Sequence, residues 1–295
     1  MDNEEKPCGT ALTGEPPLIL GGMILYRIMN DRESPVCVLN RDLHDLPVVI
    51  SIPHSGVSMT DLMAQNLRKD AILANMDWYL PELYNFLENM GFTVVINRMS
   101  RYVIDPNRDL AGGTQQNYTK ALIYEKTTFG RDLYQCTLSE EEIQARIDRF
   151  YNPYHQTLHD LISEKQKYFD RVYLLDLHSF GREIEADVVL GNCDGKSMND
   201  RLTLRINDLF SANHYKVSLN QPFGGGYIVR HYGRANERCE ALQIELAYRA
   251  YIGKRSFGEE ESPSIDAHIM QDCRDKLRRI FEELKQVLLA DSRRV

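Results

Sequence analysis

The sequence predicts a single α/β domain in which a mixed, largely parallel β-sheet carries helices on both faces. Short apolar runs rich in Val, Ile and Leu alternate with longer segments of helical periodicity, which is typical of strand–helix units. The 295 residues contain no internal repeat or low-complexity linker, and 43% apolar content suffices for one large core. We therefore expect one domain over residues 23–295, preceded by a glycine- and proline-rich N-terminal arm over residues 1–22.

The first half of the chain is expected to alternate between strands and a broken helix. Gly91 stops the helix, and Pro81 suits the first turn of its second part. In order, the expected elements are strands at 23–30 and 48–52, a helix over 61–87 interrupted near 75–78, a strand at 92–96, and an irregular segment from 97 to 136. Irregular segments of that length in a compact domain are usually functional or disordered.

The second half opens on a long helix. Ser139 is its expected N-cap, with Glu142 completing a capping box. The helix leads to a strand from 172 to about 181, a strand at 186–190, a helix over about 198–210, strands at 215–219 and 241–246, and a last helix from 263 to about 290.

Composition and charge exclude several classes of protein. The net charge of −8, a pI near 5.6 and the lack of a Lys/Arg run argue against nucleic acid or anionic lipid as a partner. No stretch approaches the ~20 apolar residues of a membrane helix, and the acidic N-terminus is unlike a signal peptide, so we expect a cytoplasmic protein. Six scattered cysteines without a CxxC pair indicate reduced thiols rather than a cysteine metal site.

Two of the expected strands lead directly to a histidine. The strand at 48–52 is followed by Pro53 and His54, and the strand that begins at Val172 contains His178 near its end. Ligands of open α/β sheets bind beyond the carboxyl ends of strands, so the two imidazoles could converge there. One such histidine is more often structural, but two, each followed by serine, favour a zinc site, which usually takes three protein ligands and a water.

Asp77 is the strongest candidate for the third ligand. It interrupts an apolar stretch at the expected break in the first helix. The alternative is that Asp77 caps the helical segment entered through Pro81, and the residues alone favour neither interpretation.

A glutamate also lies inside an apolar strand. With a period of two, Glu245 shares a face with Gln243, opposite Leu242, Ile244 and Leu246, and could simply point at solvent. A buried carboxylate beside a metal site is, however, what a hydrolase needs as a general base. The sequence leaves both interpretations open.

Arginines gather in the irregular segment after the strand at 92–96. Guanidinium groups bind carboxylates with two hydrogen bonds, so Arg101 and Arg108 could clamp an anionic substrate. The alternative is a set of surface salt bridges to Asp105 and Asp109.

Three consecutive glycines at 224–226 permit close approach of the backbone to a ligand. This loop lacks the lysine of a P-loop and the spacing of a dinucleotide motif, so nucleotide binding is not expected. A flexible hinge is the alternative.

Five short motifs, in order between about residues 45 and 255, together resemble the N-formylglutamate amidohydrolases. They are Pro53-His54-Ser55-Gly56, the segment from Ser100 to Arg108, Asp176-Leu177-His178-Ser179, the segment from Gly224 to Tyr227, and Gln243-Ile244-Glu245-Leu246. The resemblance implies a zinc hydrolase with a fold like that of the zinc carboxypeptidases, which cleaves N-formyl-L-glutamate to formate and L-glutamate in histidine degradation.

The resemblance also implies roles for particular residues. The metal ligands would be His54, Asp77 and His178, and the general base would be Glu245. The residues that bind a small anionic N-acyl amino acid would be Arg101, Asn107, Arg108, Gly225, Gly226 and Arg230. The carboxypeptidases take their carboxylate ligand from a His-x-x-Glu motif, whereas this chain has Val57 at that position.

Two other hypotheses remain at this stage. One is a zinc-dependent deacylase of another N-acyl amino acid, which would keep the metal residues and differ in the pocket. The other is a non-catalytic ligand-binding protein on the same fold, which the presence of His54, His178 and Glu245 disfavours. Nothing in the sequence indicates an oligomeric state.

Overall fold

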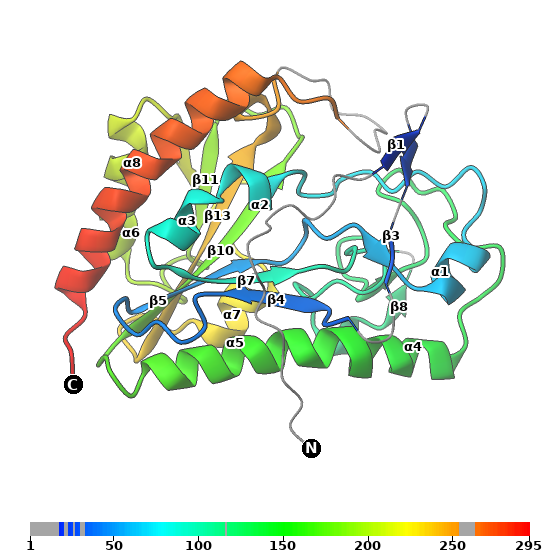
Figure 1. The fold of residues 1–295 in the computed structure, drawn as a ribbon, viewed down its shortest axis with the longest axis horizontal. Coiled ribbons are helices and arrows are strands. Elements are labelled where there is room, and N and C mark those ends of the chain that lie inside the picture. The colour runs from blue at the N-terminus through cyan, green and yellow to red at the C-terminus, as the bar shows by residue number, and fades with distance from the viewer. Residues whose placement is uncertain (1–17, 21–22, 26, 30–32, 116, 254–262) are drawn as a thin grey trace.

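A mixed seven-stranded sheet forms the centre of the molecule (Figure 1). The computed structural model describes residues 18–20, 23–25, 27–29, 33–115, 117–253 and 263–295. In spatial order the strands are β12 (Val217–Leu219), β11 (Val188–Gly191), β13 (Cys239–Ala247), β10 (Val172–Phe180), β5 (Val48–Ile52), β7 (Thr93–Asn97) and β4 (Val36–Leu39). Neighbours pair in parallel except β11 with β13 and β4 with β7. The predicted mixed, largely parallel sheet is therefore confirmed.

Helices cover both faces of this sheet, as predicted (Figure 1). One face packs against α5 (Asn152–Lys165) and α7 (Tyr227–Tyr232), and the other against a layer of α2 (Leu80–Leu83), α3 (Phe86–Asn89), α6 (Asp200–Ala212) and α8 (Ala267–Asp291). Alternate residues of β10 divide between the two cores: Val172 and Leu174 lie with α5, whereas Tyr173 and Leu175 lie with α6 and α8. β10 is buried along its whole length because both of its faces are covered.

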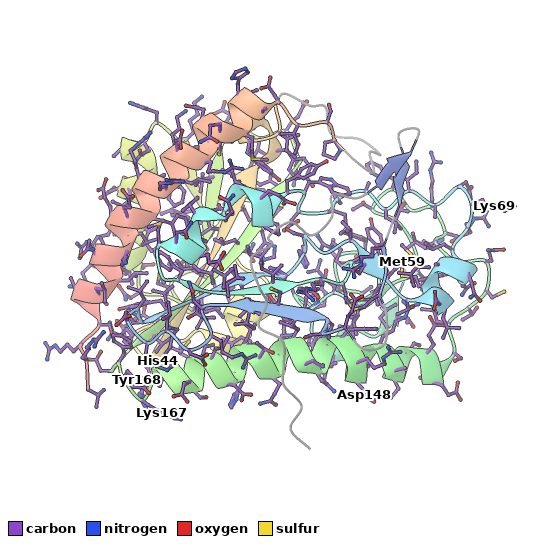
Figure 2. The ribbon with its side chains drawn as sticks, in the orientation of Figure 1. His44, Met59, Lys69, Asp148, Lys167 and Tyr168 are labelled. Atoms are coloured by element: carbon purple, nitrogen blue, oxygen red, sulfur yellow. The ribbon has the colours of Figure 1, made fainter. Side chains whose placement is uncertain are left out.

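The long helix predicted after Ser139 is present as three consecutive segments, α4 (Glu140–Arg146), the π-helical η2 (Ile147–Tyr151) and α5. Ser139 is the N-cap, and its hydroxyl accepts a hydrogen bond from the backbone N–H of Glu142 at 3.2 Å. Figure 2 shows Asp148 in η2 and Lys167 just past α5 pointing away from the sheet, which agrees with their exposure. The helix therefore buries one face only.

The helix predicted over residues 61–87 is wrong in extent. Helical residues are confined to α1 (Asp61–Asn66), α2 and α3, and residues 67–79 are irregular. Asn75 and Tyr79 have positive φ angles, and tyrosine hydroxyls donate to the carbonyls of Ala74, Met76 and Trp78. Because side chains satisfy these carbonyls, the segment needs no helical hydrogen bonds.

Three small ladders complete the described strands. β1 (Leu18–Leu20) pairs antiparallel with β2 (Met23–Leu25), β3 (Arg27–Ile28) pairs with β6 (Ser58–Met59), and β8 (Thr114–Gln115) pairs with β9 (Ile123–Tyr124). Two short 3₁₀ segments, η1 (Leu110–Gly112) and η3 (Tyr248–Ala250), lie in loops. Most of the N-terminal arm predicted over residues 1–22 lies outside the described residues, and the domain boundary at residue 23 stays a prediction. Of the helices described, none combines the length and apolar character required to cross a bilayer.

Candidate active site

The carboxyl ends of the central strands open into a cavity of about 520 Å³. Its walls include every predicted site residue except Arg230: His54, Asp77, Arg101, Asn107, Arg108, His178, Gly225, Gly226 and Glu245. These residues come from the ends of β5, β10 and β13, from the segments that follow β5 and β7, and from the loop before α7. The fold thus brings together residues that are almost 200 positions apart in the chain.

Two imidazoles and one carboxylate meet at the bottom of this cavity. The ligand atoms of His54, Asp77 and His178 all lie within 4.8 Å of one another, and the three residues are buried. Asp77 Oδ2 lies 2.9 Å from His178 Nδ1 and 3.6 Å from His54 Nδ1. In both histidines, therefore, Nδ1 is the nitrogen that faces the shared centre.

A second carboxylate stands behind each imidazole. His54 Nε2 lies 2.7 Å from Asp105 Oδ1, and His178 Nε2 lies 2.7 Å from Asp176 Oδ2. A carboxylate there favours the proton on Nε2, so Nδ1 is the nitrogen that would bind a metal. Asp176 is itself fixed, because Ser51 Oγ donates to its Oδ1 at 2.6 Å.

The buried charges of the centre stabilise one another. Burial raises the pKa of Asp77, but its close contacts with His178 and His54 outweigh that effect and leave its pKa below the usual range. Burial likewise opposes ionisation of Asp105, yet His54, Arg108 and Arg101 hold its pKa well below normal. Both carboxylates are therefore ionised at neutral pH, as metal ligation and its support require.

Asp77 does not cap a helix. The N-cap position of α2 is Tyr79, which makes no side-chain capping bond. Instead, the backbone N–H of Asp77 donates to the carbonyl of His54 at 3.2 Å, and its Oδ2 also accepts from the backbone N–H of Ser179 at 3.3 Å. Ser55 Oγ donates to the Asp77 carbonyl at 2.6 Å. The serines that follow the two histidines thus position the carboxylate between them.

Glu245 does not point at open solvent. It pairs in register with His178 on the neighbouring strand and is 9% exposed, because its face of β13 is the one that α7 covers. Burial is the main cause that raises the pKa of Glu245 to about 7, and the nearby Asp77 adds to it while His178 opposes it. Gln243 Nε2 donates to Glu245 Oε1 at 2.9 Å and so orients the carboxylate. A carboxylate with this pKa suits proton transfer near neutral pH.

The two arginines of the irregular segment differ in their contacts. Arg101 is buried, donates to Asp105 Oδ2 at 2.8 Å and to Tyr124 at 3.0 Å, and its pKa is raised well above normal despite burial. Its ion pair is therefore internal rather than on the surface. Arg108 is more accessible, donates from Nη1 to the Asn107 carbonyl at 3.0 Å, and lies 3.8 Å from Asp105 Oδ2; Nε of both arginines has no partner in the described structure. Arg108 thus has donors available for a ligand.

Asn107 is tied to the glycine loop. Its Oδ1 accepts from the backbone N–H of Ile228 at 2.8 Å, and its Nδ2 lies 3.2 Å from His178 Nε2. A Cβ on Gly226 would lie 2.2 Å from Asn107 Nδ2, and Gly225 has a φ of +125°. Glycine is therefore required at Gly226 by close approach and at Gly225 by backbone conformation.

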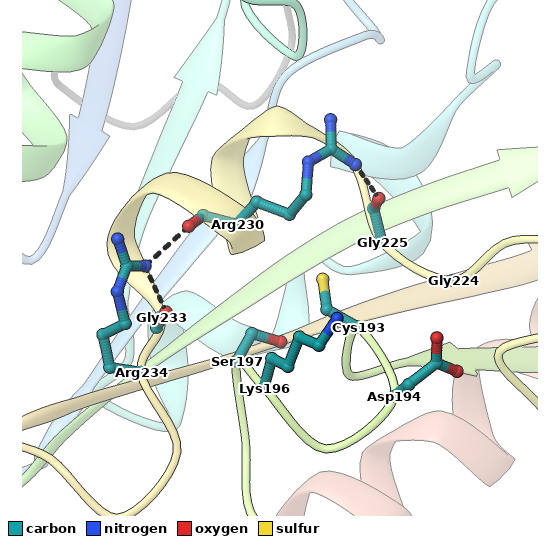
Figure 3. A pocket seen from close by; sticks show the side chains of 9 residues that line it. All are labelled: Cys193, Asp194, Lys196, Ser197, Gly224, Gly225, Arg230, Gly233 and Arg234. Atoms are coloured by element: carbon teal, nitrogen blue, oxygen red, sulfur yellow. Dashed lines mark hydrogen bonds between the residues drawn. The ribbon is translucent and has the colours of Figure 1, made fainter.

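Arg230 lies elsewhere. It projects from α7 into a second cavity and donates to the Gly225 carbonyl (Figure 3). Among the ten residues predicted from the sequence, it alone does not line the first cavity.

Among the residues of the cavity and its support that the sequence does not single out, four charged or polar ones matter most: Asp105, Asp176, Arg182 and Gln243. Asp176 could have been found, since it stands two positions before His178 and therefore shares its strand face. The sequence indicates Asp105 only as a salt-bridge partner of the arginines, and Gln243 only as a neighbour of Glu245 on its strand. Arg182 lines the cavity, is exposed, and forms no ion pair within the described part of the chain.

The sequence is similar to those of one family of known proteins. Residues 46–252 match the family model of N-formylglutamate amidohydrolase. The chain is 32% identical over 260 residues to an N-formylglutamate deformylase of Pseudomonas putida and 30% identical over 257 residues to one of Pseudomonas aeruginosa. In each case the match covers 83% of this chain and 93% of the relative.

Solved structures show the same fold. An N-formylglutamate amidohydrolase of Ralstonia eutropha superposes with a TM-score of 0.74 at 24% identity, covering 86% of this chain and 98% of that one. A gene product of Agrobacterium tumefaciens superposes with a TM-score of 0.61 at 20% identity, covering 87% and 98%.

Proposed function

Because the chain belongs to the N-formylglutamate amidohydrolase family, we propose that it hydrolyses N-formyl-L-glutamate to formate and L-glutamate. One observation carries the proposal: the His54–Asp77–His178 centre, the carboxylate of Glu245 and the available donors of Arg108 line one cavity of about 520 Å³. That combination offers a metal site, a proton acceptor and an anion-binding group within reach of one small substrate.

Zn²⁺ is the metal we propose for the His54–Asp77–His178 centre. Two imidazoles and one carboxylate form a donor set that catalytic zinc takes, with a further position left for water. The donors suit this role because each imidazole turns Nδ1 to the centre while Asp105 or Asp176 holds Nε2. When bound, zinc supplies a Lewis acid that polarises a carbonyl group and lowers the pKa of water towards ~7.

Glu245 is the proposed general base. In the hydrolysis, it accepts a proton from the attacking water at its carboxylate, and the water oxygen bonds to the formyl carbon. The C–N bond then breaks, and Glu245 returns the proton to the leaving amine of glutamate. The raised pKa of about 7 lets the group both accept and release that proton near neutral pH.

The substrate carboxylates are assigned to arginines at the cavity wall. Arg108 and Arg182 are the proposed contacts, since both line the cavity, Arg182 is exposed, and Arg108 is more accessible than Arg101 and lies 3.8 Å from its nearest carboxylate oxygen. Arg101, in contrast, forms an ion pair with Asp105 and a hydrogen bond to Tyr124. Its guanidinium also lies 3.9 Å from Asp77 and adds positive charge beside that carboxylate. Asn107 Oδ1 is used in a hydrogen bond that supports the glycine loop, so this oxygen is not proposed as a substrate contact.

The decisive experiment measures formate release from N-formyl-L-glutamate by the purified chain, before and after chelation and after zinc is restored. We expect activity that chelation abolishes and zinc recovers, and Glu245→Gln should keep zinc binding and lose turnover. N-formyl-L-glutamine and N-acetyl-L-glutamate serve as controls for the side-chain carboxylate and the acyl group. Faster turnover of either control than of N-formyl-L-glutamate would reassign the substrate, and no metal-dependent hydrolysis of any of them would overturn the proposal.

A further inference from the structure

A second cavity, of about 500 Å³, borders the glycine loop (Figure 3). It shares Gly224 and Gly225 with the catalytic cavity and no other lining residue. Its remaining walls come from the turn after β11 and from α7 and the residues that follow it: Cys193, Asp194, Lys196, Ser197, Arg230, Gly233 and Arg234. None of these residues takes part in the proposed hydrolysis.

The walls of the second cavity carry an excess of positive charge. Lys196, Arg230 and Arg234 contribute three cations, against the single carboxylate of Asp194. The two guanidinium groups donate only to backbone carbonyls, and within the described residues none of the three cations forms an ion pair (Figure 3). Unpaired arginine and lysine side chains around a concave site favour an anionic ligand.

A buried hydroxyl without a partner lies in the same wall. Ser197 is 1% exposed, and its Oγ has no hydrogen-bond partner in the described structure. Buried polar groups are nearly always satisfied, and a hydroxyl can donate to an anion. A bound anion would supply the acceptor that this hydroxyl lacks.

Contacts connect the second cavity to the general base. Arg230 donates to the carbonyl of Gly225, and the adjacent Gly226 N–H donates to Gln243 Oε1 at 2.6 Å. Gln243 in turn donates to Glu245 Oε1 at 2.9 Å. An anion that attracts the Arg230 guanidinium would weaken the hydrogen bond from Arg230 to the Gly225 carbonyl. The glycine loop could then shift, and its hydrogen bond to Gln243 would pass that shift on to Glu245.

We propose that this cavity is a second binding site, for a small anion that bears carboxylate or phosphate groups, and that its occupancy changes the turnover of the catalytic cavity. The site goes beyond the proposed hydrolysis, because its charged residues are separate from the metal centre and from Arg108. Three cations against one carboxylate favour a dianion over a monoanion.

The binding test titrates inorganic phosphate and, separately, succinate into the purified full-length chain by calorimetry. At least one of the two should bind, and the tighter one identifies phosphate or carboxylate as the preferred group. Lys196→Gln and Ser197→Ala should each weaken that binding, the lysine change by about tenfold, since one charge-assisted contact is lost. Arg205→Gln, an exposed change on α6 outside both cavities, should leave the binding unchanged.

Two results would overturn the site. One is that neither anion binds, and the other is that both bind equally well to Lys196→Gln, Ser197→Ala and the unaltered chain, which would place them in the catalytic cavity. The coupling is tested by kinetics: the binding anion should change kcat in the unaltered chain, and Lys196→Gln should need about tenfold more of the anion for the same change. A change in KM alone, present in both proteins, would mean competition with substrate and would refute the coupling.

Discussion

Replacing Asp176 by Asn tests whether the carboxylate behind His178 prepares that residue for metal binding. The change keeps the size of the side chain and removes its charge. Ser51 Oγ donates to Asp176 Oδ1, so an asparagine that kept this contact would turn its NH₂ group towards His178 Nε2. The imidazole would then carry its proton on Nδ1, the nitrogen that faces the centre, and could not bind a metal there.

The magnitude follows from the contact that is lost. The Asp176–His178 hydrogen bond is 2.7 Å long, is fully buried and involves a charged acceptor. Such a bond contributes roughly 1.5–3 kcal/mol, which corresponds to about a 10- to 150-fold loss of zinc affinity. Because the effect is on affinity, it should appear without any measurement of turnover.

The assay is a competition titration of zinc between the protein and a chelating dye. Asp291→Asn is the matched control, since it neutralises another well-buried carboxylate that pairs with Arg171 at 3.0 Å and lies outside the cavity. We expect Asp176→Asn to weaken zinc binding and Asp291→Asn to leave it unchanged. Equal zinc affinity of Asp176→Asn and the unaltered chain would refute the role assigned to the second carboxylate.

Three further predictions concern the base, the glycine loop and a buried histidine. Burial raises the pKa of Glu245 to about 7, and a general base must be unprotonated, so log kcat/KM should rise with pH up to about 7 and then level. A bound cation would move this rise to lower pH. A kcat/KM that falls over pH 5–7 would contradict the role assigned to Glu245. Gly226→Ala should lose activity, because its Cβ would lie 2.2 Å from Asn107. Gly224→Ala should retain activity, because the atom nearest to its Cβ would be 3.5 Å away. Steady-state kinetics of the two variants compare them directly. His155 forms its hydrogen bonds inside the protein, and burial lowers its pKa from 6.5 to about 4, so the unfolded state binds the proton first as pH falls. Between pH 7 and pH 5, the free energy of unfolding of the unaltered chain should therefore drop by about 2 kcal/mol more than that of His155→Gln, as measured by urea denaturation. Equal drops in the two proteins would show that His155 is not the cause.

Much of the sheet was predictable because its strands have local signatures. β5, β10 and β13 are apolar runs that are buried on both faces, and each lies where the sequence predicts a strand. The cap at Ser139 is equally local, since it depends on residues three positions apart. Edge strand β4 and the short helix α7 were missed, because four- and six-residue elements carry little periodic signal.

The segment between α1 and α2 shows where local reasoning fails. Its helical pattern is overridden by Tyr102, Tyr248 and Tyr251, which approach from distant parts of the chain and bind its carbonyls. The same irregular backbone carries Asp77 to the two histidines. No rule of spacing predicts such a turn, because its hydrogen-bond partners are up to 173 residues away.

By itself, the sequence determined the types of chemistry that this protein brings to the ends of its strands: two histidines, a strand glutamate and arginines in an irregular segment. It also carried the motifs of the amidohydrolase family. The tertiary structure alone decided which carboxylates serve which histidine, that Asp77 does not cap a helix, and that Arg230 belongs to a second cavity. The physical reason is that residue type and period fix which face of a strand a side chain occupies, whereas its partners, charge state and cavity depend on the packing of segments that are remote in the chain.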